Sequence, residues 1–418
     1  MHRPLHLDEL VDSLSFLQTK HTKLQYQSKT IVQGGGIYGK LNSSLPVEVE
    51  EMKEEDSEAQ LQEAIEHLMR KPLIEHQLVV KAIFAPKSCD LVVGVSNGAA
   101  DIAASGMLVN DLLRRYADLL RDASKAPTST EIAPIIDDLS NIFPSATRTS
   151  FLGWRAVKAS MKEYTRMAKA IQVQSPLRLQ LDQSPPSFFT IELSSELSSS
   201  LERKAIDNGV DMLSAFAAAV SLAARDKLFK LSVDRDQSIP VDLWINHDLR
   251  IDGFQPHFPN NTMTVAEVPS YHILSSGSSS SSRNVWEMAR EIYDDVKRVI
   301  STDQLFDSYH FAPTASAVKV RSISSVPMAP FVFQEAHGLT IDPSVVEQLE
   351  IDDIRLAETA TPGTCKLILS RFNHKLQLSF NFPVGAMNAA EAEVVTDAAL
   401  DLLRCESPKM NRPDDEQD

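Results

Sequence analysis

A short polar turn, Ser96-Asn97-Gly98-Ala99-Ala100-Asp101, lies between an apolar run and a helical pattern. The run at 91–95 has the β-branched composition of a buried strand, and 102–120 has apolar residues at helical spacing. A turn between a strand and a helix exposes side chains and is a common place for chemistry. The carboxamide of Asn97 can orient a nucleophile or polarise a carbonyl, but it cannot remove a proton near neutral pH. An ordinary turn residue that tolerates unusual backbone angles is the competing interpretation of Asn97.

Other candidate groups are scattered along the chain. His247 lies near the end of a predicted strand, and His337 precedes Gly338. Each of the 11 histidines has an alternative role on the surface or in packing. No G-x-S-x-G elbow is present, so Ser96 and Ser105 are interpreted as turn and helix-start residues.

Two further patterns exclude common classes of site. The glycines at 34–36 fit neither a GxGxxG nor a Walker spacing, so this stretch is interpreted as a loop. Cys89, Cys365 and Cys405 lie far apart, which excludes a disulfide framework and a cysteine-based zinc pattern.

Composition limits the partners and the compartment. The chain has 418 residues with 41 Lys and Arg against 57 Asp and Glu, a net charge of −16. This acidity argues against a nucleic-acid partner, and no apolar run is long enough for a membrane span. The opening residues lack the apolar region of a signal peptide. We therefore expect a cytoplasmic protein.

Helical and strand patterns alternate through the chain, which predicts an α/β or α+β fold. Residues 1–175 and 176–405 are expected to form two halves, followed by a disordered acidic tail at 406–418. A serine run at 275–282 is interpreted as a flexible surface insertion, and the acidic stretch 48–58 as a solvated face. The elements expected are helices at 7–24, 59–69, 102–120, 154–171, 194–208, 212–224, 285–300 and 389–403, and strands at 78–84, 91–95, 188–193, 241–246, 367–372 and 376–382.

The order of these elements resembles the acyltransferase superfamily of peptide-synthetase condensation domains, alcohol acetyltransferases, polyketide-associated acyltransferases and plant BAHD enzymes. The hallmark of that superfamily, HHxxxDG after a strand and before a helix, matches the turn at 96–102 in degenerate form. The segment ending Lys20-His21-Thr22-Lys23-Leu24-Gln25 is similar to its RHPxLR-type helix end. The strand ending in Leu249-Arg250, the alanine-rich helix, the final hairpin and the closing helix also agree in position. The resemblance covers roughly residues 7–403.

The resemblance implies two similar chloramphenicol-acetyltransferase-like halves, each a mixed sheet with helices, around a central channel. In the superfamily the second motif histidine is the general base, and here that position is Asn97. Asp101 keeps the family aspartate, which pairs with an arginine that by position is Arg250. Gly98, His247 and His337 are the other expected channel residues. The family's first strand has no counterpart before residue 7, so either the sequence starts late or the fold lacks that strand.

Two functions follow from this resemblance. The first is an acyltransferase, weak or altered in activity, that moves an acyl group from coenzyme A or a carrier-protein thioester to a hydroxyl or amine. The second is a non-catalytic protein that binds an acyl ligand or a protein partner. The acyl thioester would be a co-substrate, and we expect a monomer with no tightly bound cofactor or metal. A third interpretation is that the resemblance is fortuitous and the chain is another kind of α/β protein.

Overall fold

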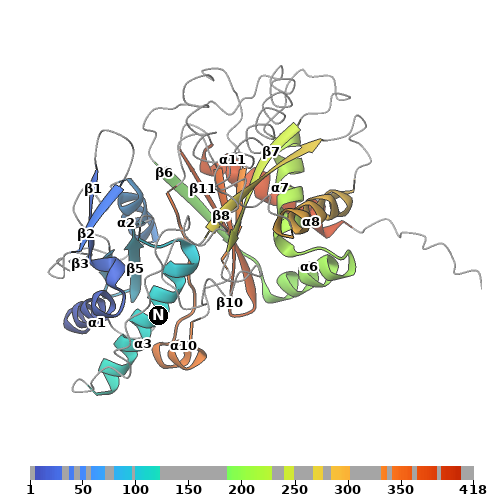
Figure 1. Cartoon of the computed structure of the whole chain (residues 1–418). Helices are drawn as coiled ribbons and strands as arrows, with labels where there is room; N and C mark the ends of the chain where they lie inside the picture. Colours follow the sequence, from blue (N-terminus) through green and yellow to red (C-terminus); the bar gives the residue numbers. More distant parts are fainter. Residues whose placement is uncertain are drawn as a thin grey trace, which may run out of the picture.

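A computed structural model gives the fold of the chain (Figure 1). The structure describes residues 5–30, 37–41, 48–52, 58–70, 80–96, 99–122, 186–227, 240–248, 267–275, 284–301, 331–336, 341–359, 365–383 and 387–405. We call residues 5–122 the N-terminal part and residues 186–405 the C-terminal part. Both contain helices and strands, as the sequence predicts, and the fold class is α/β.

The N-terminal part is built on a three-stranded sheet with the order β3-β4-β5. Strands β4 and β5 are antiparallel, and β3 runs parallel to β4. Leucines of α1 and α3 pack with β4 in one apolar cluster, so these two helices cover one face of the sheet. A Cβ added at Gly94 of β5 would lie 3.2 Å from Leu68 of α2, which places α2 on the opposite face. The elements are α1 (Leu7–Lys20), η1 (Thr22–Gln25), β1 (Tyr26–Thr30), β2 (Ile37–Leu41), β3 (Glu48–Glu51), α2 (Glu58–Arg70), β4 (Val80–Ala85), β5 (Asp90–Val95) and α3 (Ile102–Arg121).

The C-terminal part is built on a six-stranded sheet with the order β6-β11-β10-β9-β7-β8. Strands β7, β9 and β10 are parallel, and their other neighbours are antiparallel. The tight turn between β10 and β11 has Asn373 and His374 at φ 47° and 63°, the geometry that suits a two-residue hairpin. The elements are β6 (Pro186–Glu192), α6 (Ser195–Asp207), α7 (Met212–Lys227), β7 (Pro240–Asp248), β8 (Glu267–Ser275), α8 (Val285–Ile300), β9 (Phe331–Glu335), α10 (Pro343–Leu349), β10 (Cys365–Phe372), β11 (Lys375–Pro383) and α11 (Ala389–Arg404).

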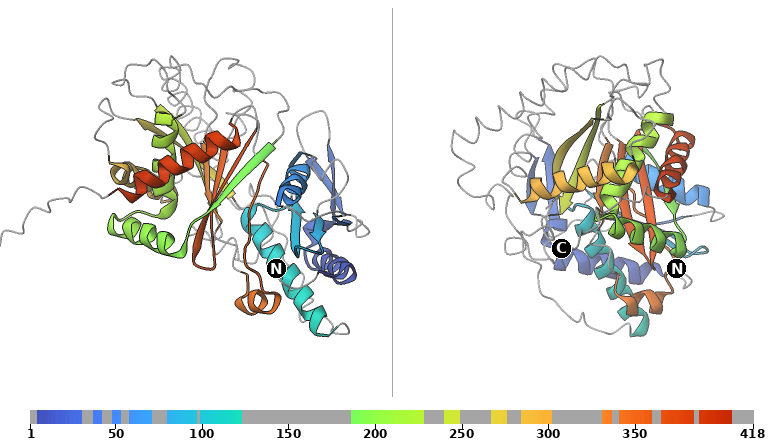
Figure 2. Two further views of the ribbon diagram at one scale, coloured as in Figure 1. Left: turned by 180° about the vertical axis from the view of Figure 1, so that it is seen from behind. Right: turned by 90° about the vertical axis from the view of Figure 1, so that its right-hand side faces the viewer.

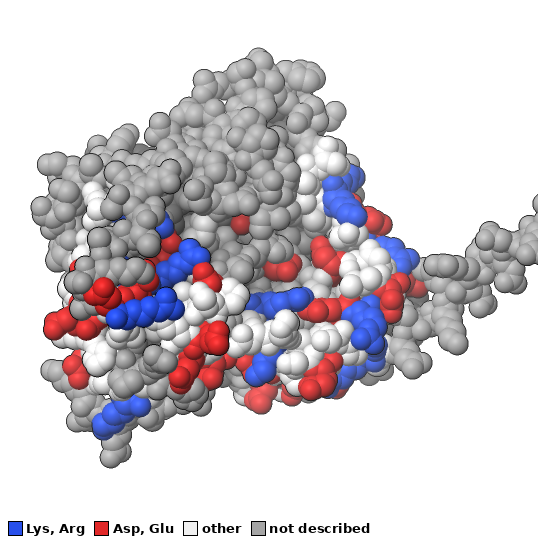
Figure 3. Space-filling model, turned by 90° about the horizontal axis from the view of Figure 1, so that it is seen from below, with Lys and Arg blue, Asp and Glu red and all other residues white. Residues whose placement is uncertain are grey.

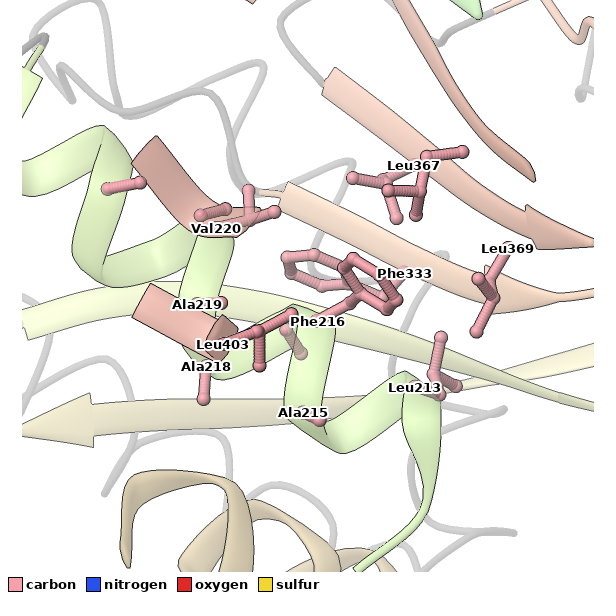
Figure 4. Packing of buried hydrophobic residues seen from close by; sticks show 14 of the residues in the cluster. Leu213, Ala215, Phe216, Ala218, Ala219, Val220, Phe333, Leu367, Leu369 and Leu403 are labelled. Carbon is pink, nitrogen blue, oxygen red and sulfur yellow. The ribbon is translucent and has the colours of Figure 1, made fainter. Parts of the chain in front are cut away.

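One large core fills the space between this sheet and the helices α6, α7, α8 and α11. Phe216 of α7 and Phe333 of β9 are both completely buried in it (Figure 4). The small alanines of α7 let the helix lie close to the sheet, while phenylalanines and leucines from the strands fill the remaining volume. All four helices lie on the same side of the sheet (Figure 2).

The opposite face of the sheet meets the N-terminal part through the connection between β9 and β10. The described residues of this connection form α10 and then a segment without regular secondary structure, residues 351–359, which we call the strap. Val345 and Leu349 of α10 share an apolar cluster with Leu113 and Tyr116 of α3. Gln348 donates a hydrogen bond of 2.7 Å to the carbonyl of Ala117. The connection is therefore packed between α3 and the large sheet.

Most of the expected helices and strands are confirmed within one to four residues. The opening helix ends at Lys20 instead of residue 24, because the chain changes to a 3-10 turn. The acidic stretch is in part a strand, since β3 pairs with β4 and its Glu48 and Glu50 form ion pairs with Lys81. The expected helix at 154–171, serines 276–282 and the tail at 406–418 lie outside the described residues.

None of the helices that the structure describes is by itself long and apolar enough to cross a membrane. Helices α6 and α7 reach that length and composition only as a pair, bent by 98° at the break between them.

Candidate functional site

Asp101 begins the helix that follows the degenerate motif. Its Oδ1 accepts a hydrogen bond of 2.8 Å from the backbone N–H of Ala104, so the residue is the N-cap of α3. The side chain is buried. A capping carboxylate satisfies an N–H group that the first turn leaves unpaired, and the helix dipole favours its charge. Asp101 therefore fixes where α3 starts.

The start of α3 contacts the middle of the six-stranded sheet. Ile102, the first helical residue, forms a buried apolar cluster with Ala336 after β9 and Ile368 in β10, and Leu356 of the strap packs against it. This cluster is where the N-terminal part meets the central strands of the C-terminal part. The side chain next to Asp101 in sequence is thereby anchored on the large sheet.

Ile368 belongs to a row of side chains that crosses five strands on the face of the sheet opposite the helices. We call this row, in which the other side chains are polar, the polar row. Strand pairing aligns Asn246 with Gln334, Gln334 with Ile368, Ile368 with Ser379, and Ser379 with Thr190. Their neighbours along each strand, such as Phe333 and Leu367, point into the core, so alternation directs the row toward the N-terminal part.

Ile368 is the apolar member of this row, and polar side chains lie on both sides of it. Asn246 Nδ2 donates to Gln334 Oε1 at 3.2 Å on one side. Thr190 Oγ1 donates to Ser379 Oγ at 3.2 Å on the other. The first helical residue of α3 thus contacts the single apolar position between two hydrogen-bonded pairs.

The strap is attached to β10 and β11 by partly buried polar contacts. Asn381 Oδ1 accepts a hydrogen bond of 2.8 Å from the backbone N–H of Glu358, and the carboxylate of Glu358 pairs with Lys366. Gln377 donates to Asp353 at 2.5 Å. These polar side chains on the sheet therefore serve to hold the strap in place.

Asp342 joins α10 to the middle of α3. Its carboxylate caps α10 through the N–H of Ser344, and its backbone N–H donates to Asn110 Oδ1 at 2.9 Å. Arg114 of α3 lies 2.5 Å from Asp342 Oδ2. Hydrogen bonds from Arg114 and Ser344 hold the pKa of the Asp342 carboxyl at about 2. Seen from below the view of Figure 1, basic and acidic side chains are interspersed over the described residues (Figure 3).

His247 is buried in β7 and lies on the helix-covered face by alternation, since Leu243 and Ile245 of the same strand face the core. Its neighbour Asn246 instead belongs to the polar row. Among the sequence-predicted site residues, the structure describes Asp101 and His247. Asn97, Gly98, Arg250 and His337 lie outside the described residues, and their roles stay predictions.

Asn246 and Gln334 are side chains of this region that the sequence analysis did not select. The signal available was a polar residue within each apolar strand, Trp244-Ile245-Asn246 and Phe331-Val332-Phe333-Gln334. No group of three or more His, Cys, Asp or Glu side chains suitable for a metal ion occurs in the described ranges.

Comparisons with known proteins identify the fold. No protein-family model matches the chain, and no curated protein sequence does. Among solved structures, polyketide synthase associated protein 5 from Mycobacterium tuberculosis has a TM-score of 0.64 at 14% identity, covering 96% of this chain and 91% of that one. The first condensation domain of the calcium-dependent antibiotic synthetase has a TM-score of 0.67 at 11% identity, with coverages of 96% and 88%.

A trichothecene 15-O-acetyltransferase from Fusarium sporotrichioides has a TM-score of 0.66 at 13% identity, covering 95% of this chain and 86% of that one. The chain therefore has the condensation-domain-like fold of coenzyme A-dependent acyltransferases, as its sequence predicts. At these identities the likeness concerns the fold, and chemistry has to be argued from the residues of this chain.

Proposed function

We propose that this chain binds an acyl thioester where the start of α3 meets β9 and β10, and transfers the acyl group to a hydroxyl or amine acceptor. The observation that carries the proposal is the buried contact of Ile102 with Ala336 and Ile368. Ile102 directly follows the degenerate motif in the sequence, and it lies at the contact between the two parts of the chain. The likeness in fold to acyltransferases and condensation domains supports the same reaction type.

In the proposed reaction the acceptor oxygen or nitrogen attacks the thioester carbonyl carbon. The carbon–sulfur bond breaks, and the departing thiolate takes up the proton that the acceptor loses. Asn97 would donate a hydrogen bond to the carbonyl oxygen as negative charge develops on it, or would orient the acceptor. Because a carboxamide is not a base, the reaction is expected to lack the ~10²–10⁴-fold rate increase that a general base supplies.

The alternative is a protein that binds an acyl thioester without turning it over. The specific observation in its favour is the carboxamide at position 97 where the superfamily has its base. Both functions predict binding of the thioester, and they differ in whether a thiol is released.

The test is thiol release from short- and long-chain acyl-coenzyme A, with and without pooled alcohols and amines. Acceptor-dependent release above a heat-denatured control is the result expected. The variant Asn97→Ala should lose most of this release, and Asn97→His should increase it if the surrounding groups still orient the acceptor. Binding without release, in a protein that melts cooperatively, would favour the non-catalytic alternative. Absence of both would contradict the proposal.

A further inference from the structure

The two hydrogen-bonded pairs in the polar row beside Ile368 differ in their surroundings. On the Thr190–Ser379 side, the strap makes hydrogen bonds to β11 through Asn381 and Gln377. On the other side, Asn246 is partly exposed to solvent while Gln334 beside it is 2% exposed. Asn246 is therefore a polar side chain, on the face of the sheet opposite the helices, that a ligand can reach.

The hydrogen bond between the two carboxamides fixes which atom Asn246 presents. Its Nδ2 donates to Gln334 Oε1, which orients the amide plane and leaves Oδ1 without a partner in the part of the chain that the structure describes. A carboxamide oxygen is a strong acceptor with two lone pairs. Asn246 thus offers an acceptor, held in place by a buried neighbour, to any donor that approaches this face.

The position of Asn246 relates it to the proposed reaction centre. Adjacent strands lie about 4.8 Å apart, so Asn246 is two strand spacings, roughly 10 Å, from Ile368 and the start of α3. A thioester of coenzyme A or a carrier protein has secondary amides in its thiol arm, and acyl chains derived from amino acids have them on the other side of the thioester. Both place an N–H group within several bonds of the reacting carbonyl carbon.

We propose that Asn246 is a specificity-determining residue that accepts a hydrogen bond from a secondary amide N–H of the thioester substrate, with Gln334 as its positioning residue. This inference rests on the proposed function and adds a substrate class to it. Replacing the amide by an ester removes the donor and turns an ester oxygen toward Asn246 Oδ1. That replacement selectively weakens binding.

The experiment compares dissociation constants, by ligand-observed NMR titration, within two pairs of thioesters that differ by one amide-to-ester replacement. The first pair is the hexanoyl thioester of N-acetylcysteamine and that of 2-acetoxyethanethiol, which tests the thiol arm. The second is the N-hexanoylglycyl and O-hexanoylglycolyl thioesters of N-acetylcysteamine, which test the acyl chain. One hydrogen bond contributes about 1 kcal/mol, so one of the two replacements should weaken binding to the wild type about fivefold.

Two near-isosteric variants make the result specific. Asn246→Leu should abolish that fivefold difference, because the acceptor is gone. Thr190→Val is the matched control, since Thr190 lies in the same row, is also partly exposed, and also donates a 3.2 Å hydrogen bond to a buried neighbour. It should keep the difference. The pair that shows the difference identifies the thiol arm or the acyl chain as the source of the amide.

Equal binding of amide and ester in both pairs would overturn the inference while leaving the proposed function standing. A difference that persists in Asn246→Leu would overturn it as well. If a cooperatively folded wild-type protein binds none of the four thioesters, the proposed function fails, and this inference fails with it.

Discussion

His21 at the end of α1 places its Nε2 atom 2.8 Å from Asp111 Oδ2, in the middle of α3. Lys20 Nζ lies 2.7 Å from the same carboxylate oxygen. The imidazole is almost fully buried, so the pair joins the two helices inside the N-terminal part. The helix that carries Asp101 at its start is therefore held along its length by charge as well as by leucine packing.

Asp111 is expected to make the stability of the N-terminal part depend on pH. Burial acts to raise the pKa of its carboxyl, but the hydrogen bonds from His21 and Lys20 outweigh it and hold the pKa below 3.8. A lowered folded-state pKa means that the contribution is complete well above pH 3.8 and is lost as pH falls below that value. Asp111→Asn should cost about 1–3 kcal/mol at pH 7, measured by urea unfolding, and the difference from wild type should shrink below pH 4. A constant difference between pH 7 and pH 3 would contradict this assignment.

Asp101 is expected to have two separable roles. Asp101→Ala removes the cap of α3, which costs about 1 kcal/mol. Asp101→Asn keeps an oxygen acceptor for the N–H of Ala104, so it preserves the cap and removes the charge. If Asp101 pairs with Arg250 as the resemblance implies, Asp101→Asn should still cost about 3–5 kcal/mol, since it leaves a guanidinium without its partner.

The double variant Asp101→Asn with Arg250→Leu should recover part of that loss in urea unfolding. Wild-type stability of Asp101→Asn would instead leave capping as the role of this residue and refute the ion pair.

Asp342 is expected to control how firmly α10 is held on α3. In Asp342→Asn the ion pair with Arg114 is lost, and backbone amides of α10 should exchange hydrogen faster at pH 7. The matched control is Asp295→Asn, which removes an ion pair with Arg298 inside α8 and should leave exchange in α10 unchanged. Because the pKa of Asp342 is depressed to about 2, the stabilising effect of its charge is present above pH 3.8 and is lost as pH falls from there toward 2. Unchanged exchange of α10 in Asp342→Asn would refute this role.

The three thiols are expected to differ in reactivity. Cys405 is exposed, whereas Cys365 and Cys89 are buried, and burial raises the pKa of the Cys365 thiol to about 12. Since the thiolate is the reactive form, an alkylating reagent should modify Cys405 first in the native protein and reach Cys365 only on unfolding. Mass spectrometry of the labelled protein measures this order. Native labelling of Cys365 as fast as Cys405 would contradict it, and Cys405→Ser should lower the background in the thiol-release assay.

Local sequence patterns predict the parts of the fold that depend on local interactions. The apolar stripe of α3, the alanine-rich α7 and the turn at Asn373 and His374 all follow from spacing and residue type alone. The seven-residue α10 is too short to give a clear helical period, and β9 has five residues. Such short elements are fixed by what they pack against, which composition does not reveal.

The candidate site is less completely predictable from the sequence, for the same reason. Asp101 could be selected because it stands in a recognisable motif before a helix. Asn246 could not, because its neighbour Gln334 lies 88 residues further along the chain, and only the pairing of β7 with β9 brings them together. The place of His247 near a strand end favours it from the sequence. Alternation along β7, however, directs Asn246 and not His247 toward the face of the sheet opposite the helices.

The connection between β9 and β10 has an evolutionary consequence. These two strands are parallel neighbours, so the chain must cross one face of the sheet to pass from one to the other. The helices occupy one face, and the crossover, with α10 and the strap, lies on the other, against α3. Val345, Leu349 and Ile351 of the crossover are buried in one apolar cluster with residues of α3, so the connection is itself part of the core between the two parts. A change in the length of the crossover therefore has to be matched by changes in α3, and the two segments are expected to vary together among chains of this fold.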